Sequence, residues 1–480
     1  ASANLNLDKF LPSKTGIKLP LYISTSKTRV TPKYDPLDKD IPLSASINSF
    51  DSKKEQDDYR LLTEERVESK SISLNNVRKE RTNPESRVDF WDIENFTTGF
   101  SFTERKSSNV TTQSIETREH RGNITYNFSP KSVSLEPFKN IKWLDSKVFQ
   151  IIKDLNFNPL PSNINISGDL NRRFNKTQYR NSDLSIEGVD PIYEKYFSFN
   201  KSYSMRWNIF SSMNIDLSVV NNSVVDEPEG ELDTQEKLDS MYYNLKRLGR
   251  TKNFNQNIQV NYKIPINKLP LLDWVSSNAK YSSRYLWSAG SYLQSDTLGN
   301  IVENGREYSL TTKLDISKFY DKIPILKNYK KKYKEKDTVS SIFQSRVFDG
   351  IMKVLLSVRS INLNYNVNER TGISGIIHSP GIFGLNSFSK SPGWNFILGS
   401  QDSKIRNLAA DNGWLVANDY LNNPFVQSRN NNFQFRSSIQ PLNSLRIQLD
   451  AKRIVSENFQ EIFRFDSNKG SFVSLTPTRG

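Results

Sequence analysis

The residues from Tyr203 to Val219 alternate between apolar and polar side chains. Every odd position except Ser211 is apolar or aromatic, and every even position except Phe210 is polar. This period of two is typical of a β-strand with one apolar and one polar face. At about 3.3 Å per residue, one strand of this length spans about 55 Å, whereas a membrane-crossing strand needs only about 9 to 11 residues. The run therefore predicts a strand that continues beyond a bilayer.

The same alternation recurs along the chain. It is found at Phe96–Phe102, Ile124–Phe128, Ile258–Ile264, Tyr281–Trp287, Tyr308–Ile316, Ile361–Val367 and Leu445–Leu449. The phase slips by one residue between Val358 and Ile361, which indicates a β-bulge. Helical periodicity is limited to short stretches near 144–152 and 235–248. Roughly fifteen strands are expected from these patterns.

The predicted connections come in two sizes. Compact turns containing proline are expected at "NFSPKSVSLEPFKNIKW", "VNYKIPINKLPLLDWV", "DISKFYDKIPILKNY" and "RSSIQPLNSLRIQLD", and long loops near 221–250, 327–341 and 369–431. Outer-membrane barrels have short periplasmic turns and long extracellular loops. We therefore predict an all-β fold, in which residues 1–480 belong to one very large antiparallel transmembrane β-barrel with tall strands and no separate soluble domain. A β-sandwich is the alternative, although its strands are mostly about 5 to 6 residues long.

The alternation assigns candidate residues to each face of the barrel wall. The lipid-facing candidates are Trp207, Ile209, Met213 and Ile215, and the lumen-facing candidates are Arg206, Asn208, Ser212 and Asn214. The candidates for an aromatic girdle at the membrane interface are Trp274, Tyr285 and Trp287.

The composition is compatible with such a barrel. The mean hydropathy is -0.62 and 36% of the residues are hydrophobic, and no window approaches the 18 to 20 uncharged apolar residues of a transmembrane helix. A barrel strand needs an apolar residue only at every second position. The absence of cysteine excludes a disulfide-stapled scaffold and a thiolate metal site. We interpret both ends, "ASANLNLDKF" and "TPTRG", as cuts within a longer protein.

The search for chemistry indicates no enzyme, no cofactor and no metal. His120 and His378 have no metal-ligand spacing, and no phosphate cradle, nucleophile elbow or carboxylate pair stands out. The net charge of +14 comes from Lys and Arg interspersed with Asp and Glu, so we expect no nucleic-acid binding. The acidic run 226–233 could hold Ca²⁺, and the basic run 327–336 could dock on anionic headgroups. Solvated loops are the preferred interpretation of both.

Several segments together resemble one family. They are "NLNLDKFLPSKTGIKLPLYISTS" with "TPKYDPLDKDI", "LNFNPLPSNINISGDLNRRFNKTQYRN", "INKLPLLDWVSSNAKYSSRYLW" and "GWNFILGSQDSKIRNLAADNGWL". They are similar to the SprA/Sov family, which forms the outer-membrane translocon of the type 9 secretion system. The resemblance runs in order over most of the chain. Its most specific parts are "FNPLPSNINISGDLNRRF" and "GSQDSKIRNLAADNGWL", because general barrel chemistry requires neither.

The resemblance implies a non-enzymatic channel in the cell outer membrane that exports proteins with a C-terminal sorting domain, including gliding adhesins. It also implies membrane lipid and three kinds of partner: a smaller, PorV-like outer-membrane barrel that receives cargo, a periplasmic plug, and indirectly the inner-membrane motor complex. Three alternatives stay open from the residues alone. They are another outer-membrane transporter for lipopolysaccharide or a small ligand, a secreted β-sandwich adhesin, and a β-rich glycosidase, for which no carboxylate pair can be located.

Overall fold

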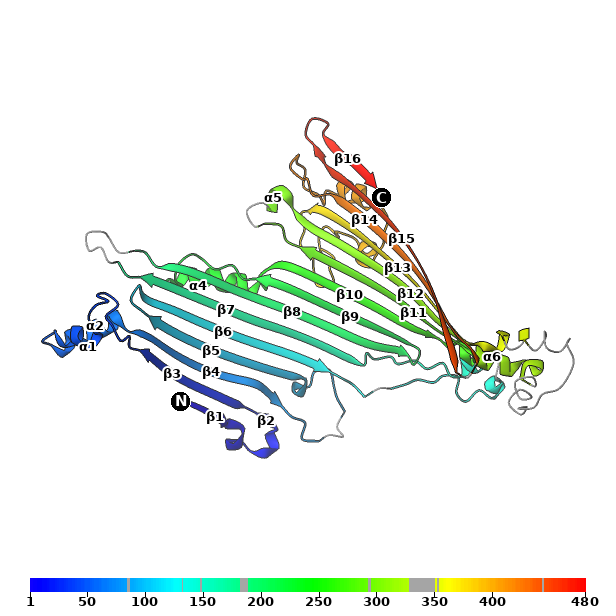
Figure 1. Cartoon of the computed structure of the whole chain (residues 1–480), viewed down its shortest axis with the longest axis horizontal. Coiled ribbons are helices and arrows are strands. Elements are labelled where there is room, and N and C mark those ends of the chain that lie inside the picture. The colour runs from blue at the N-terminus through cyan, green and yellow to red at the C-terminus, as the bar shows by residue number, and fades with distance from the viewer. Residues whose placement is uncertain are drawn as a thin grey trace. The chain divides into compact units, whose positions relative to one another are not determined.

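Strands make up most of the computed structural model, which describes residues 1–83, 87–131, 133–146, 149–181, 189–291, 295–327, 350–351, 354–442 and 444–480 (Figure 1). They are β1 (Ser2–Asn6), β2 (Ile17–Lys18), β3 (Pro20–Val30), β4 (Glu65–Lys79), β5 (Phe96–Ser108), β6 (Thr112–Phe128), β7 (Asn163–Tyr179), β8 (Ile192–Phe210), β9 (Met213–Val224), β10 (Arg250–Ile264), β11 (Val275–Ser288), β12 (Asn300–Asp315), β13 (Val358–Ile376), β14 (Phe425–Leu442), β15 (Leu445–Asp466) and β16 (Ser471–Arg479). The order in the sheet follows the order in the chain, except that β2 pairs with β4 beside this path. The strand pairs from β1 to β7 and from β10 to β16 are antiparallel. The predicted all-β, antiparallel fold class is confirmed.

Short helices occupy the connections between strands. They are α1 (Leu43–Asn48), α2 (Lys53–Thr63), α3 (Gln150–Lys153), α4 (Gln235–Lys246), α5 (Ser295–Leu298), α6 (Ile316–Lys322), α9 (Trp394–Ile397) and α10 (Ile405–Asp411), with 3₁₀ turns η1 (Leu7–Phe10), η2 (Ser13–Thr15), η3 (Ile93–Asn95), η4 (Lys142–Asp145) and η5 (Pro265–Lys268). The two predicted helical stretches correspond to η4 with α3 and to α4. The Thr234 side chain caps α4 by accepting a hydrogen bond from the Lys237 amide. In the part of the chain that the structure describes, no helix has the length and apolar character to cross a bilayer.

The chain folds as two compact units. The first unit contains Ala1–Ser129, Ile164–Tyr203 and Val220–Lys252, and the second contains Pro130–Asn163, Ser204–Val219 and Asn253–Gly480. Strands β7, β8, β9 and β10 contribute residues to both units. The predicted single barrel over the whole chain stays a prediction.

The first unit has its hydrophobic cluster beneath helix α4. Phe197, Val225 and Met241 are buried together there. Partly buried side chains complete the cluster: Leu170, Phe199, Leu232, Leu238 and Leu245. The β9–β10 connection, where a long loop was predicted near 221–250 with a helical stretch near 235–248, is therefore packed onto the strands.

The alternating run from Tyr203 to Val219 is a hairpin, so the prediction of one tall strand there is wrong. β8 ends at Phe210, Ser211 and Ser212 form the turn, and β9 begins at Met213. Serine is a common turn residue because its hydroxyl bonds the local backbone, and Phe210 and Ser211, the two exceptions to the alternation, lie at this turn. Tall strands do occur elsewhere. β15 has 22 residues, which corresponds to roughly 70 Å.

Several connections differ from their predicted bounds. β13 extends to Ile376 and β14 starts at Phe425, so the loop predicted at 369–431 is residues 377–424. The predicted loop at 327–341 lies outside the described residues except for Lys327, as does the basic run that starts there. It lies in the β12–β13 connection, which also contains the predicted turn "DISKFYDKIPILKNY". The predicted β-bulge near Val358 is confirmed by a register shift between Val358 and Ser360.

Candidate functional site: a two-faced wall and its docked segment

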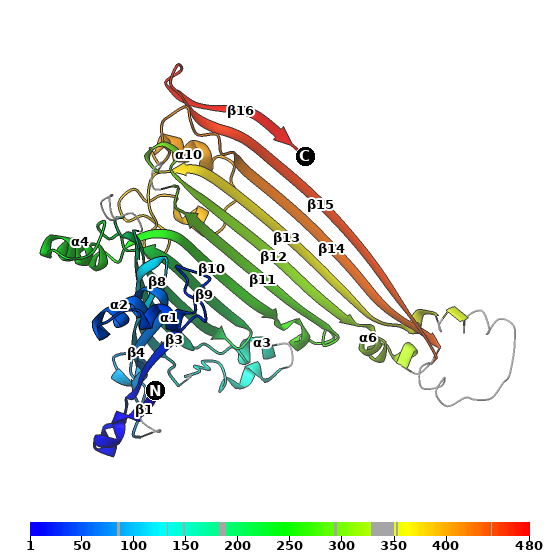
Figure 2. The same ribbon diagram turned by 60° about the vertical axis from the view of Figure 1, so that its left-hand side comes forward.

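Strands β10 to β14 of the second unit run side by side (Figure 2). They carry different side chains on their two faces. Directly paired residues of antiparallel strands project to the same side of the sheet. On one face, which we call the polar face, Asn261, Lys280, Ser309, Asn366 and Asn432 form a row across five strands. Amides and hydroxyls both donate and accept hydrogen bonds, so this face suits water or a polar chain.

The opposite face carries an apolar band. Its row Tyr262, Ala279, Leu310, Tyr365 and Phe433 is continuous across the same five strands. The rows above and below it add Val260, Ile264, Val275, Tyr281, Tyr308, Leu314, Ile361, Leu363, Val367 and Phe435. Leu310, Tyr365 and Phe433 are each more than 40% exposed. A contiguous exposed apolar surface of this kind marks contact with a membrane or another protein.

The predicted lumen-facing residues gather on the polar side of the β8–β9 hairpin. Arg206 Nε donates to Asp216 Oδ1 at 2.6 Å, and Asn214 Nδ2 donates to Asp216 Oδ2 at 2.7 Å. A hollow of about 830 Å³ has Asn208, Ser212 and Asn214 in its lining. The same hollow is lined by residues of the polar face, among them Asn261, Asn278 and Lys280.

The predicted lipid-facing residues of this hairpin have mixed surroundings. The Trp207 indole Nε1 donates to the carbonyl oxygen of Asn158 at 2.8 Å, so its polar edge is satisfied by protein. Met213, directly after the turn, also lines the hollow. Ile209 lies just before the turn, and its backbone carbonyl oxygen accepts a hydrogen bond from the Asn158 amide at 2.9 Å. Their contact with lipid, and that of Ile215, stays a prediction.

The face that carries the apolar band is covered further along the strands by residues 377–424, which we call the docked segment. Phe396 of this segment packs edge-on against Tyr285, with ring centroids 6.2 Å apart. The Trp287 indole donates to the carbonyl oxygen of His378 at 3.0 Å. Further buried apolar residues lie on both sides of the contact: Val302, Ile373, Ile376 and Phe425 on the strands, and Ile397, Ala409, Trp414, Leu415, Val416 and Leu421 on the segment. The segment is therefore part of the folded core.

This packing changes the expected role of two aromatic residues. Tyr285 is 1% exposed and Trp287 is 3% exposed. Both follow the alternation of β11, but the docked segment covers them, so the expectation of an interfacial girdle at these positions is not met. The third candidate, Trp274, is partly exposed, packs against Phe319 at a centroid distance of 4.7 Å, and donates to the Leu271 carbonyl at 2.8 Å.

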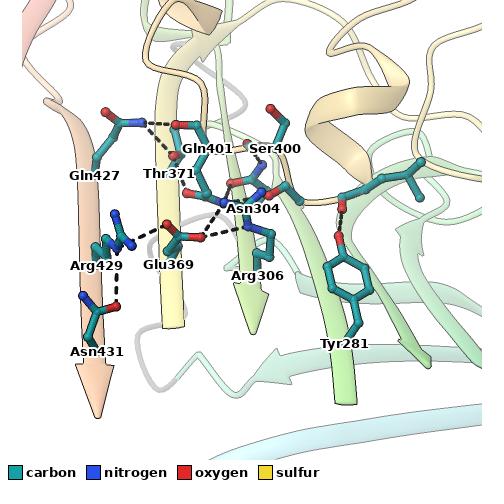
Figure 3. A network of polar contacts seen from close by, with 12 residues as sticks. Tyr281, Asn304, Arg306, Glu369, Thr371, Ser400, Gln401, Gln427, Arg429 and Asn431 are labelled. Carbon is teal, nitrogen blue, oxygen red and sulfur yellow. Dashed lines mark hydrogen bonds and ion pairs between the residues drawn. The ribbon is translucent and has the colours of Figure 1, made fainter. Parts of the chain in front are cut away.

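A polar network fixes the docked segment to the strands (Figure 3). Gln401 Nε2 donates to Asn304 Oδ1 at 2.9 Å, and Gln401 Oε1 accepts from Thr371 Oγ1 at 2.7 Å. Gln427 Nε2 donates to the Gln401 carbonyl at 3.2 Å. Asn304 and Thr371 are 1% and 0% exposed. Buried polar groups are tolerated when they are hydrogen-bonded, and this network meets that condition.

Beside this network lies a charged row. Arg306 Nε donates to Glu369 Oε2 at 2.8 Å, and Arg429 Nε lies 3.6 Å from Glu369 Oε1. These residues occupy the positions where the alternation calls for apolar side chains, directly beyond Val367. The apolar band therefore ends at a row of charges.

Sequence reasoning missed this site, although two signals were present. Gln401 lies within the family-specific motif "GSQDSKIRNLAADNGWL", whose residues have no role in a bare strand. Arg306 and Glu369 interrupt the apolar side of two otherwise regular strands. Polar residues at core positions indicate a specific partner, which here is the docked segment.

The acidic run 226–233 of the first unit is neutralised by basic side chains. Arg172 binds Glu227 through two hydrogen bonds of 2.6 and 3.1 Å, and Lys237 donates to Asp233 at 2.8 Å. Asp226 pairs with Arg250, and Glu231 with Lys176. Within the described residues no group of three or more His, Cys, Asp or Glu could hold a metal ion. The pairs with Arg172, Lys176 and Arg250 join the β9–β10 connection to β7 and β10.

The fold and these faces define a class: an antiparallel β-sheet wall with a polar side and an apolar side of the kind found in membrane-associated β-barrels. A comparison with known families matches the N-terminal residues. Residues 1–47 match the SprA_N family model, which is described as a motility related/secretion protein. The match supports the assignment of the chain to the SprA/Sov family, and with it a role related to motility or secretion. A comparison with curated proteins found no match.

Proposed function

We propose that this chain forms part of the wall of a protein-conducting channel in the cell outer membrane, the translocon of the type 9 secretion system. Proteins, including gliding adhesins, would pass along the polar face from the periplasm to the cell surface. One observation carries this proposal. Over the same stretch of β10 to β14, one face of the sheet carries the apolar band and the opposite face is rich in asparagine.

The length of the apolar band supports a membrane position. On β13 the apolar band lies between two charged residues, Arg359 and Glu369. Residues 360–368 lie between them. A membrane-crossing strand takes about 9 to 11 residues. Strands β11 to β14 extend beyond this length, and the docked segment contacts them there. A wall taller than the bilayer suits a large translocon.

The polar face suits the passage of a polypeptide. Its asparagine, serine and threonine side chains offer weak, exchangeable hydrogen bonds, and its charged groups are largely paired, such as Lys280 with Glu307 at 3.1 Å. A surface without apolar patches gives a moving chain few places to adhere. The cargo, the smaller PorV-like barrel, the periplasmic plug and the inner-membrane motor are the partners that this function requires.

Photo-crosslinking from the two faces tests the function. A benzophenone amino acid is placed at Asn261 or Asn366 on the polar face, and at Leu310 or Tyr365 on the apolar band, in the intact protein in its native membrane. We expect secreted proteins to crosslink to the first pair only. Lipopolysaccharide captured at the first pair would favour a lipopolysaccharide transporter instead. Solubility of the intact protein without detergent would favour the adhesin.

A further inference from the structure

The apolar band ends at an aromatic pair. Tyr281 on β11 and Tyr308 on β12 are directly paired, and their ring centroids lie 5.3 Å apart. In the next row Ser283 is paired with Arg306, and the Arg306 guanidinium lies 4.9 Å from the centre of the Tyr308 ring. The surface thus changes from apolar to charged within one row, with tyrosine at the boundary.

Helix α9 of the docked segment is fixed onto this boundary. The Tyr281 hydroxyl donates to the carbonyl oxygen of Leu398, and Ser283 Oγ donates to the carbonyl of Ile397 at 3.0 Å. Gly399 follows with φ +94°, and a Cβ there would lie 3.1 Å from Ser283 Oγ and 3.3 Å from Arg306 Cβ. A side chain at this position would therefore combine two tight contacts with a backbone conformation that favours glycine. The height of α9 relative to the band is therefore set by direct contacts.

One side of α9 is buried and the other is open and apolar. Phe396 and Ile397 are each 1% exposed, whereas Trp394 is 50% and Leu398 is 44% exposed. Trp394 and Leu398 are four residues apart, so they lie on the same side of the helical turn. The Leu398 amide donates to the Trp394 carbonyl at 2.9 Å, which keeps the two residues one turn apart. This exposed apolar pair adjoins the end of the apolar band, where the Leu398 carbonyl oxygen accepts the hydrogen bond from the Tyr281 hydroxyl.

We propose that Trp394 and Leu398, with Tyr281 and Tyr308, contact the lipid headgroup zone of the membrane, so that the docked segment rests on the membrane edge. The inference depends on the proposed function, because it requires lipid on the apolar band. Tryptophan and tyrosine favour this zone since their rings have an apolar body and a polar edge. Arginine likewise keeps its stem in the apolar layer and its head in water. Lipid is the occupant that we commit to, because the exposed apolar row of five strands gives way to a tyrosine pair and then to charges. Leu398, with its exposed side chain, lies at this same boundary.

Spin labelling tests the inference directly. The chain has no cysteine, so single cysteines can be introduced and labelled with a nitroxide in proteoliposomes. The variants are Trp394→Cys and Leu398→Cys, with Leu363→Cys within the band, Asn364→Cys on the polar face and the exposed Asp411→Cys in α10 as controls. Collision rates with oxygen and with a water-soluble nickel chelate report depth. We expect high oxygen access at position 363, high nickel access at 364 and 411, and intermediate depth at 394 and 398.

The controls separate the two levels of the proposal. One result would overturn the headgroup contact alone: labels at 394 and 398 collide with the nickel chelate as often as the label at 411 does, while the label at 363 keeps high oxygen access. The proposed function would then still stand. Labels at 394 and 398 shielded from both reagents would replace lipid with a protein partner and also overturn the headgroup contact. A water signature at 363 would contradict the proposed function itself. Native heat-modifiable migration of each variant in gels confirms that it is folded, and two independent positions guard against a local defect at Trp394.

Discussion

The side-chain amide of Gln401 donates a hydrogen bond to Oδ1 of Asn304 at 2.9 Å, which joins the docked segment to β12. Asn304 in turn donates to the carbonyl oxygens of Phe396 at 2.9 Å and Ser400 at 2.7 Å. A single buried asparagine therefore satisfies three polar groups of the segment. These directional hydrogen bonds fix the position of the segment along the strands, and its buried apolar residues hold it against them.

The first prediction concerns Asn304. Replacement of Asn304 by Ala leaves the Gln401 amide and two carbonyls without this partner, and each unsatisfied buried group costs about 1 to 3 kcal/mol. We expect faster hydrogen–deuterium exchange across residues 394–401, with the strands of the apolar band unchanged. The matched control is Asn430→Ala, since Asn430 is exposed on the polar face. Equal exchange in both variants would contradict the role of the network.

The second prediction concerns the facing of β13. Leu363→Arg places a charge in the apolar band and should cost about 2 to 4 kcal/mol if the site is near the bilayer midplane, whereas Asn364→Arg should assemble normally. The measurement is the fraction of protein inserted in outer membranes. These positions are better suited than Ile209 and Met213, because those two residues flank the Ser211–Ser212 turn rather than lie mid-strand. Assembly at the same level for both variants would show that the facing is wrong.

The third prediction concerns Gly399. Gly399→Ala introduces a Cβ at 3.1 Å from Ser283 Oγ in addition to the strain of φ +94°. Gly413→Ala is the control, because Gly413 also has a positive φ of +64° but has nothing within 4 Å of a Cβ. We expect Gly399→Ala to loosen the docked segment more than Gly413→Ala, as measured by limited proteolysis of folded protein. Similar cleavage of the two variants would mean that α9 is not seated by close approach.

The fourth prediction concerns Tyr59 on α2, whose hydroxyl donates to Asp35 Oδ2 at 2.5 Å. Burial, aided by this bond, raises the pKa of Tyr59 to about 12. Burial alone would raise the pKa of Asp35, but hydrogen bonds from Ser46 and Tyr59 outweigh it and hold that pKa below its usual value. The Tyr59 contribution to stability is complete below about pH 10 and is lost as pH rises toward 12. The Asp35 contribution is complete above about pH 4 and is lost as pH falls further.

Amide exchange of α1 and α2 over this pH range tests the pair. Protection should be constant between these limits and fall on both sides. Tyr59→Phe should lower protection at pH 7 and remove the alkaline decrease, whereas Tyr34→Phe, a change at an exposed neighbour, should do neither. An alkaline decrease that persists in Tyr59→Phe would assign the effect to another group.

The sequence could predict the faces of individual strands but not what covers them. On β13 the alternation from Ile361 to Val367 and the slip near Val358 correspond to the observed faces and bulge, because both are local properties of one strand. Tyr285 and Trp287 follow the same alternation, yet the docked segment buries them. Some of the residues that do so are more than ninety positions away in the chain, such as His378, which contacts Trp287. The docked segment has no period of its own, so no local pattern could place it.

The hairpin at Ser211–Ser212 shows a second cause of error. Alternation specifies which side a residue faces, and a turn that preserves the parity of the pattern is invisible to it. Arg206 and Asp216 lie on opposite strands of the hairpin but on one face, as their shared parity requires. The serine pair, and the two exceptions to the alternation at Phe210 and Ser211, were the local signs that the chain reverses there.

The central claim is that β13 separates lipid from water along residues 361–368. The most direct test is the reaction of single cysteines, introduced at each of these positions in turn, with a water-soluble maleimide in intact membranes. The account predicts rapid labelling at the even positions, which carry asparagine, and little labelling at the odd positions from Ile361 to Val367 until detergent is added. Labelling at similar rates along the whole stretch would contradict it.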